Sequence, residues 1–118
     1  MRFLRFEDMK IWKESKILAY DVYVVLKDCR DYAFRDQIQR AAVSVMNNIA
    51  EGYERGTSNH FINHLRIAKG SCGEVRSMLY LAVMLKYITQ EEFKNLFSRS
   101  EEISKMLVGF INQLRESK

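Results

Sequence analysis

The sequence predicts an all-α fold, a single antiparallel four-helix bundle with up-down-up-down topology. The chain has no proline, whereas an average composition of about 5% would give roughly six. Since proline interrupts helix interiors, this chain can form long helices. Only five glycines occur, so the connections should be few and short. Apolar residues recur at three- and four-residue steps, the spacing of an amphipathic helix.

The length of 118 residues suits one domain covering residues 1–118. The first helix is expected at residues 7–29. Its core-facing stripe should consist of Ile11, Trp12, Ser15, Leu18, Ala19, Val22, Val25 and Leu26. Residues 30–33 are the expected connection, and Asp31 can cap the helix that follows.

The second helix is expected at residues 34–53 and has two distinct faces. The core face consists of Ile38, Ala42, Val45 and Ile49, and a neighbouring face is small or polar. Gly52 and Gly56 should mark the end of this helix, where glycine most easily adopts a positive φ.

The third helix is expected at residues 58–86, after capping residues at 57–59. Its stripe consists of Phe61, Leu65, Ala68, Cys72, Val75, Leu79, Ala82 and Leu85. Gly70 and Gly73 lie inside it, although glycine in a helix costs about 1 kcal/mol relative to alanine. We expect a close contact with another helix at these two glycines.

The fourth helix is expected at residues 89–115. Thr89 and Glu92 form a capping box, and Ile88 and Phe93 occupy the positions of a hydrophobic staple. The apolar stripe then continues through Leu96, Ile103, Leu107, Phe110, Ile111 and Leu114. Short connections between long helices favour antiparallel neighbours, which gives the predicted topology.

The sequence offers no recognisable active site, cofactor site or metal site. His60 and His64 are four residues apart, but Phe61 stands where a zinc protease has glutamate, and neither histidine follows a glutamate by three residues. We interpret them as polar residues near a helix start. Cys72 is in register with apolar residues, so it is a core thiol and not a nucleophile. We therefore predict no enzymatic activity and no small-molecule substrate.

The expected location is the cytoplasm. Cys29 and Cys72 form no motif of a disulfide framework, which indicates two reduced, buried thiols. No apolar run approaches the roughly 20 residues that span a bilayer, so no membrane association is expected. Charges interrupt the apolar pairs of the first eight residues, a pattern unlike that of a signal peptide.

Basic residues supply the candidate nucleic-acid surface. The net charge is +4, which permits attraction to a polyanion. The third helix contributes Arg66, Lys69 and Arg76 on one face, and the second contributes Arg35, Arg40 and Arg55. If these faces adjoin, they can neutralise several phosphates of RNA or DNA. The alternative is that both are ordinary solvated helix faces.

A polar motif also follows the second helix, and its residues are Gln37, Arg40, Ser44, Asn48, Glu51, Gly52 and Arg55. Asparagine and glutamate between apolar helices are costly unless they are paired. Either Glu51 pairs with an arginine inside a polar network, or the motif lies at a subunit boundary. Both roles are structural.

Three segments resemble the four-helix bundle family of 23S rRNA intervening-sequence proteins. Residues 37–55 resemble its Q-x-R-R-A-x-x-S-I-x-x-N-I-A-E-G-x-x-R signature, with Gln39 and Val45 as departures. Residues 6–12 resemble F-E-D-L-x-V-W, and Ile67–Ser71 with Glu74 resemble I-A-x-G-S-x-x-E. Together the three segments span most of the chain.

This resemblance implies a ring-like homopentamer and supplies no catalytic residues. A related branch, the accessory variability proteins of diversity-generating retroelements, consists of basic pentamers that bind nucleic acid. Two hypotheses follow for this chain. The first is a non-enzymatic homo-oligomer that binds structured nucleic acid, RNA in particular, and the second is a scaffold or protein-interaction module with no nucleic-acid role.

Overall fold

The computed structural model describes residues 5–116. Residues 1–4, which open the segment judged unlike a signal peptide, and residues 117–118 lie outside it. Within the described range a short 3-10 helix, η1 (Phe6–Asp8), precedes four α-helices. These are α1 (Lys10–Val25), α2 (Tyr32–Glu54), α3 (Ser58–Met84) and α4 (Gln90–Glu116).

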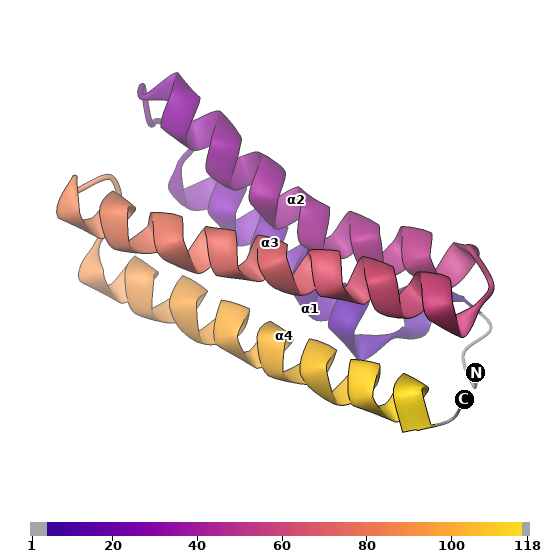
Figure 1. Ribbon diagram of the computed structural model, residues 1–118. Coiled ribbons are helices and arrows are strands. Elements are labelled where there is room, and N and C mark those ends of the chain that lie inside the picture. Colours follow the sequence, from indigo (N-terminus) through magenta and orange to yellow (C-terminus); the bar gives the residue numbers. More distant parts are fainter. Residues whose placement is uncertain (1–4, 117–118) are drawn as a thin grey trace.

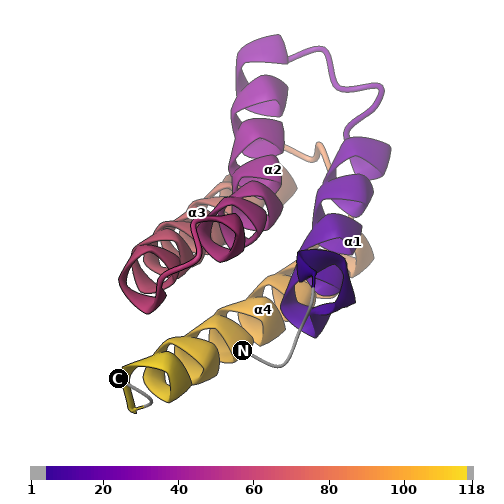
Figure 2. The same cartoon turned by 90° about the vertical axis from the view of Figure 1, so that its right-hand side faces the viewer.

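The four helices form the predicted antiparallel bundle (Figure 1). Each helix packs on the next along the chain, and α1 also packs on α4 to close the bundle. Among the described residues, α1 does not contact α3 and α2 does not contact α4, so these pairs lie on the diagonals (Figure 2). Arg99 of α4 links the closing pair through Glu14 at 2.7 Å and Asp21 at 3.7 Å, both on α1.

The core consists of the apolar stripes that the sequence predicts. Fully buried side chains include Leu18, Ile38, Leu65 and Ile103, one from each helix. Ser15 is buried as well, and its hydroxyl donates to the Ile11 carbonyl oxygen at 2.6 Å. Leu85 is an exception, because it follows the last turn of α3 and is 46% exposed.

The first helix is shorter than predicted. Met9 is extended, with φ −81° and ψ 130°, so η1 cannot continue into α1 and the helix starts at Lys10 instead of residue 7. It ends at Val25 instead of residue 29, after three β-branched residues that have low helix propensity. Cys29 therefore lies in the connection and is only half-buried, which corrects the expectation of two buried thiols.

The other helix ends differ from the predicted ones by no more than two residues. Asp31 caps α2 by accepting from the Phe34 amide at 3.2 Å, and Thr57 caps α3 by accepting from the His60 amide at 3.2 Å. Helix α3 ends two residues early because Lys86 adopts a left-handed conformation with φ 63°.

The capping box before α4 is present in both directions. The Thr89 amide donates to Glu92 Oε1 at 2.8 Å, and the Glu92 amide donates to Thr89 Oγ1 at 3.0 Å. Gly56 has the positive φ expected after α2, at 83°, whereas Gly52 does not and lies inside the helix. Within residues 5–116 no helix is long and apolar enough to cross a membrane.

Candidate functional site

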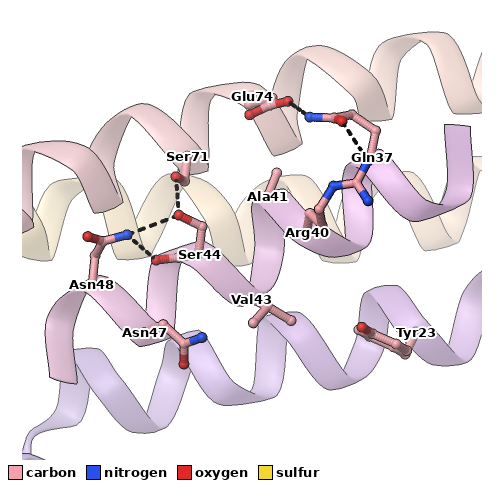
Figure 3. A pocket seen from close by; sticks show the side chains of 10 residues that line it. All are labelled: Tyr23, Gln37, Arg40, Ala41, Val43, Ser44, Asn47, Asn48, Ser71 and Glu74. Carbon is pink, nitrogen blue, oxygen red and sulfur yellow. Dashed lines mark hydrogen bonds between the residues drawn. The ribbon is translucent and has the colours of Figure 1, made fainter. Parts of the chain in front are cut away.

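A network of hydrogen bonds joins the polar motif of α2 to α3 (Figure 3). Ser71 of α3 donates through its hydroxyl to Ser44 Oγ at 2.9 Å. The Asn48 amide group donates to Ser44 Oγ at 3.0 Å and to the Ser44 carbonyl oxygen at 2.9 Å. His64 of α3 then lies 2.9 Å from Asn48 Oδ1 through its Nδ1 atom. The motif is therefore paired across the contact between two helices.

The network continues to the end of α2. His64 Nε2 lies 3.8 Å from Glu51 Oε2, and Arg55 donates to the same oxygen at 3.2 Å. Glu51 thus pairs with an arginine, which is the first of the two predicted roles. Both Glu51 and Arg55 are about half exposed at the side chain, so a surface pair of this kind contributes less than about 1 kcal/mol.

At the start of α2 a second set of contacts reaches α3. Gln37 donates to Glu74 Oε2 at 2.5 Å, and Arg40 donates to Gln37 Oε1 at 3.2 Å. The amide of Gln37 therefore bridges a cation and a carboxylate on different helices. Both contacts appear in Figure 3. Gln37 and Arg40 belong to the polar motif predicted from the sequence, whereas Glu74 was not predicted as the partner of Gln37.

Gly52 is required by the packing of α2 on α3. A Cβ added there would lie 2.6 Å from the Cβ of His64 and 3.1 Å from a ring carbon of Phe61. The Cβ of His64 cannot move away easily, because it is bonded directly to the α3 backbone. The glycine therefore permits the close helix contact that we had expected at Gly70 and Gly73.

Two open hollows flank α3 on opposite sides. The first lies over the outer face of α2 and is lined by Tyr23, Gln37, Arg40, Ala41, Val43, Ser44, Asn47, Asn48, Ser71 and Glu74. The second lies between α3 and α4. Their volumes are similar, about 550 and 530 Å³, so chemistry and not size distinguishes them. In the first hollow, one arginine is balanced by one glutamate.

The second hollow is basic, and we call it the basic groove. It is lined by Arg66, Lys69, Gly70, Gly73 and Arg76 of α3 and by Val108, Ile111, Asn112 and Arg115 of α4. None of the described residues that line it carries a carboxylate. Within residues 5–116, Arg66, Lys69, Arg76 and Arg115 form no ion pair. The described residues therefore do not neutralise the positive charge of this groove.

The structure does not join the two basic sets predicted from the sequence. Arg40 lines the first hollow, whereas the cations of α3 line the basic groove. Arg55 is paired with Glu51, and Arg35 is paired with Asp36 at 3.2 Å. The condition that the two basic faces adjoin is therefore not met, because the contact with α2 uses one side of α3 and the basic residues occupy the side toward α4. Arg115 was missed, since it comes from α4.

Gly70 and Gly73 are also placed differently from the prediction. A Cβ added at Gly70 would meet nothing within 4 Å, and one at Gly73 would meet only Nη2 of Arg76, at 3.8 Å. No helix packs on them. Because they face the basic groove and not a neighbouring helix, they leave part of the groove floor without side chains.

Arg76 is a basic side chain of the groove that is anchored by hydrogen bonds to α4. Its Nη1 atom donates to Ser104 Oγ at 2.7 Å and to Ser100 Oγ at 3.2 Å. Ser100 is fully buried and itself donates to the Cys72 carbonyl oxygen at 3.2 Å. One edge of the guanidinium is thus fixed against α4.

The remaining candidates lack the geometry of a catalytic or metal site. Cys72 is fully buried, and burial raises the pKa of its thiol, which disfavours the nucleophilic thiolate. His60 Nδ1 contacts Thr57 Oγ1 at 2.8 Å and does not converge on His64. Among the described residues no group of three or more histidine, cysteine or acidic side chains could hold a metal ion.

Comparison with known proteins agrees with the four-helix fold. The family model described as 23S rRNA-intervening sequence protein matches residues 7–109. No curated protein gives a match. A crystal structure of a protein of unknown function from the S23 ribosomal protein family of Bacteroides thetaiotaomicron VPI-5482 is 28% identical, with a TM-score of 0.80. That similarity covers 86% of this chain and 97% of the other. Since the family model covers most of its length, the chain belongs to the 23S rRNA-intervening sequence protein family.

Proposed function

We propose that this protein is a non-enzymatic homo-oligomer of the cytoplasm that binds structured RNA through a basic surface. The observation that carries the proposal is the basic groove, where four cations have no acidic partner in the part of the chain that the structure describes. Elsewhere Arg35, Arg55 and Arg99 are each paired with a carboxylate. Clustered cations without partners attract phosphate and release its counterions on binding.

The oligomer is supported by an uncovered apolar face on α1. Ile17, Tyr20, Tyr23 and Val24 recur at helical spacing and are 38 to 68% exposed. Single exposed apolar residues are common, but a row along one helix marks an interaction surface. A second copy of the chain is the partner that the family resemblance suggests.

Binding to RNA should weaken steeply with salt. If four cations each neutralise one phosphate, the logarithm of the binding constant should fall with the logarithm of salt concentration at a slope of about −3 to −4. Fluorescence anisotropy of a labelled RNA hairpin, titrated between about 50 and 200 mM salt, measures this slope. Binding that is absent or independent of salt would contradict the proposal.

Oligomerisation has a separate test. Light scattering should give a mass near a whole multiple of the 14.0 kDa chain, and about 70 kDa for a pentamer. A monomeric mass at micromolar concentration would show that the homo-oligomer is wrong. Replacing Tyr20 and Val24 with serine should lower the mass if α1 forms the contact, without changing the helical content.

The second hypothesis, a scaffold or protein-interaction module, is favoured by exposed apolar residues on α3. Ile67, Leu81 and Met84 are 52, 45 and 76% exposed. A stoichiometric protein partner recovered from cell extract, together with no RNA binding by the purified protein, would favour this function over the first.

A further inference from the structure

Nothing in residues 5–116 accounts for the two glycines of the basic groove. Neither has a positive φ, because Gly56 is the positive-φ glycine of the described residues. Neither is needed for packing, since no neighbouring helix approaches Gly70 or Gly73. Glycine nevertheless weakens a helix interior relative to alanine. A ligand that approaches the backbone of α3 closely would explain why side chains are absent there.

The cations around these glycines define the charge of that ligand. Arg66 and Lys69 precede them, Arg76 follows them, and Arg115 contributes from α4. From Arg66 to Arg76 the helix rises about 15 Å, at ~1.5 Å per residue. One strand of a duplex advances about 3.4 Å per phosphate along its axis. The rise from Arg66 to Arg76 thus matches about four phosphate-to-phosphate steps along one strand.

Arg76 presents a contact that is already oriented. Nη1 is held by Ser100 and Ser104, while Nη2 lies over Gly73, at 3.8 Å from the position of an added Cβ. Because the guanidinium is fixed before binding, less conformational entropy is lost when a phosphate oxygen reaches Nη2. A long side chain on Gly73 would occupy the same space.

The lining of the groove also indicates which part of a nucleic acid it would contact. Its apolar residues are the aliphatic Val108 and Ile111, and no aromatic ring lines it. Proteins that hold single strands stack the bases on aromatic side chains. This groove offers cations and open backbone but no surface for stacking.

We propose that the basic groove seats the phosphate backbone of a double-helical nucleic acid, with Gly70 and Gly73 forming the floor that a phosphate approaches. The site recognises the shape and charge of the duplex and not its sequence. This inference rests on the proposed nucleic-acid function, and it adds the class of ligand and the residues that contact it.

The decisive variant is Gly70→Ala combined with Gly73→Ala. Both methyl groups fit the free protein, so the melting temperature should rise, while binding of an RNA hairpin should weaken several-fold. Gly109→Ala is the matched control, because Gly109 lies in α4, has open space and does not line the groove. It should raise the melting temperature and leave binding unchanged.

Charge is tested with a second matched pair. Lys69→Gln should weaken hairpin binding and make the salt slope shallower by about 1. Lys13→Gln removes the same charge from α1, which lies diagonally across the bundle from α3. This variant should leave the slope unchanged. Light scattering and circular dichroism check that every variant keeps its assembly and helical content.

Three probes distinguish the possible ligands: an RNA hairpin, a DNA hairpin of the same sequence and an unstructured strand of equal length. Preference for both hairpins over the strand supports the proposal. Tighter binding of the strand would overturn it, as would wild-type affinity of the double glycine variant. Both results would leave the proposed RNA function standing. Only failure of the wild-type protein to bind any of the three probes would defeat that function itself.

Discussion

The two sides of α3 both have glycine and polar or charged residues, but these residues are packed and paired differently on each side. Toward α2, Gly52 faces His64 and Phe61 so closely that a methyl group cannot fit, and the polar side chains pair with one another. Toward α4, Gly70 faces open space, and the cations beside it have no acidic partner. A glycine inside a helix can therefore lie at a close helix contact or on an exposed surface, and the atoms around it distinguish the two cases.

The two sides of α3 also differ in whether their polar groups are paired within the bundle. Polar groups between α2 and α3 satisfy one another and need nothing further. Among the described residues, no carboxylate pairs with the cations of the groove between α3 and α4. Substitutions toward α2 should therefore lower the free energy of unfolding, whereas Gly70→Ala on the side toward α4 should not.

Gly52→Ala should give the largest effect. The added methyl would overlap the Cβ of His64, and overpacking of this kind costs about 1–3 kcal/mol. Alanine recovers roughly 1 kcal/mol of helix propensity, so the net loss should reach up to about 2 kcal/mol. Urea denaturation should show a lower free energy of unfolding. An unchanged or higher value would mean that the two helices can separate slightly at no cost.

Asn48→Ala should give the next largest effect. It removes a donor to Ser44 and the partner of His64, so the free energy of unfolding should fall by about 1–2 kcal/mol. Asn47→Ala is the control, because Asn47 is exposed on the same helix and should stay within about 0.5 kcal/mol of the wild type. Equal losses in the two variants would show that the network adds nothing.

Gly70→Ala alone should give the smallest effect and the opposite sign. Its added methyl meets no other atom within 4 Å, so the free energy of unfolding should rise by up to about 1 kcal/mol. Gly109→Ala should give a similar gain. If Gly70→Ala destabilised the protein, the contrast between the two sides of α3 would be lost.

The fold was predictable because its helices have clear periodicity and clear ends. The stripes of α2, α3 and α4 and the capping box at Thr89 are local features, so one sequence reveals them. The start of α1 was mispredicted because η1 keeps an apparent helical pattern through an extended Met9. Nothing in the spacing of apolar residues signals that interruption.

The candidate site was only half predictable, for a different physical reason. Arg66, Lys69 and Arg76 share a face of one helix, so their spacing alone brings them together. Their partner Arg115 belongs to α4, and its position depends on how α3 and α4 are rotated about their axes. The partners of the polar motif were not predictable for the same reason, because they depend on how α2 and α3 are rotated about their axes. These partners are His64, Ser71 and Glu74.

The pattern of helix contacts has a consequence for how the chain folds. Three of the four contacts between helices join helices that are consecutive in sequence, and only the contact of α1 with α4 joins the ends of the bundle. Proteins rich in such local contacts fold quickly, because little loop entropy is lost before each contact forms. The ion pairs of Arg99 with Glu14 and Asp21 span the longest loop, so we expect them to form late, after the α2–α3 and α3–α4 hairpins. The basic groove, made by one of those hairpins, would then be complete before the bundle closes.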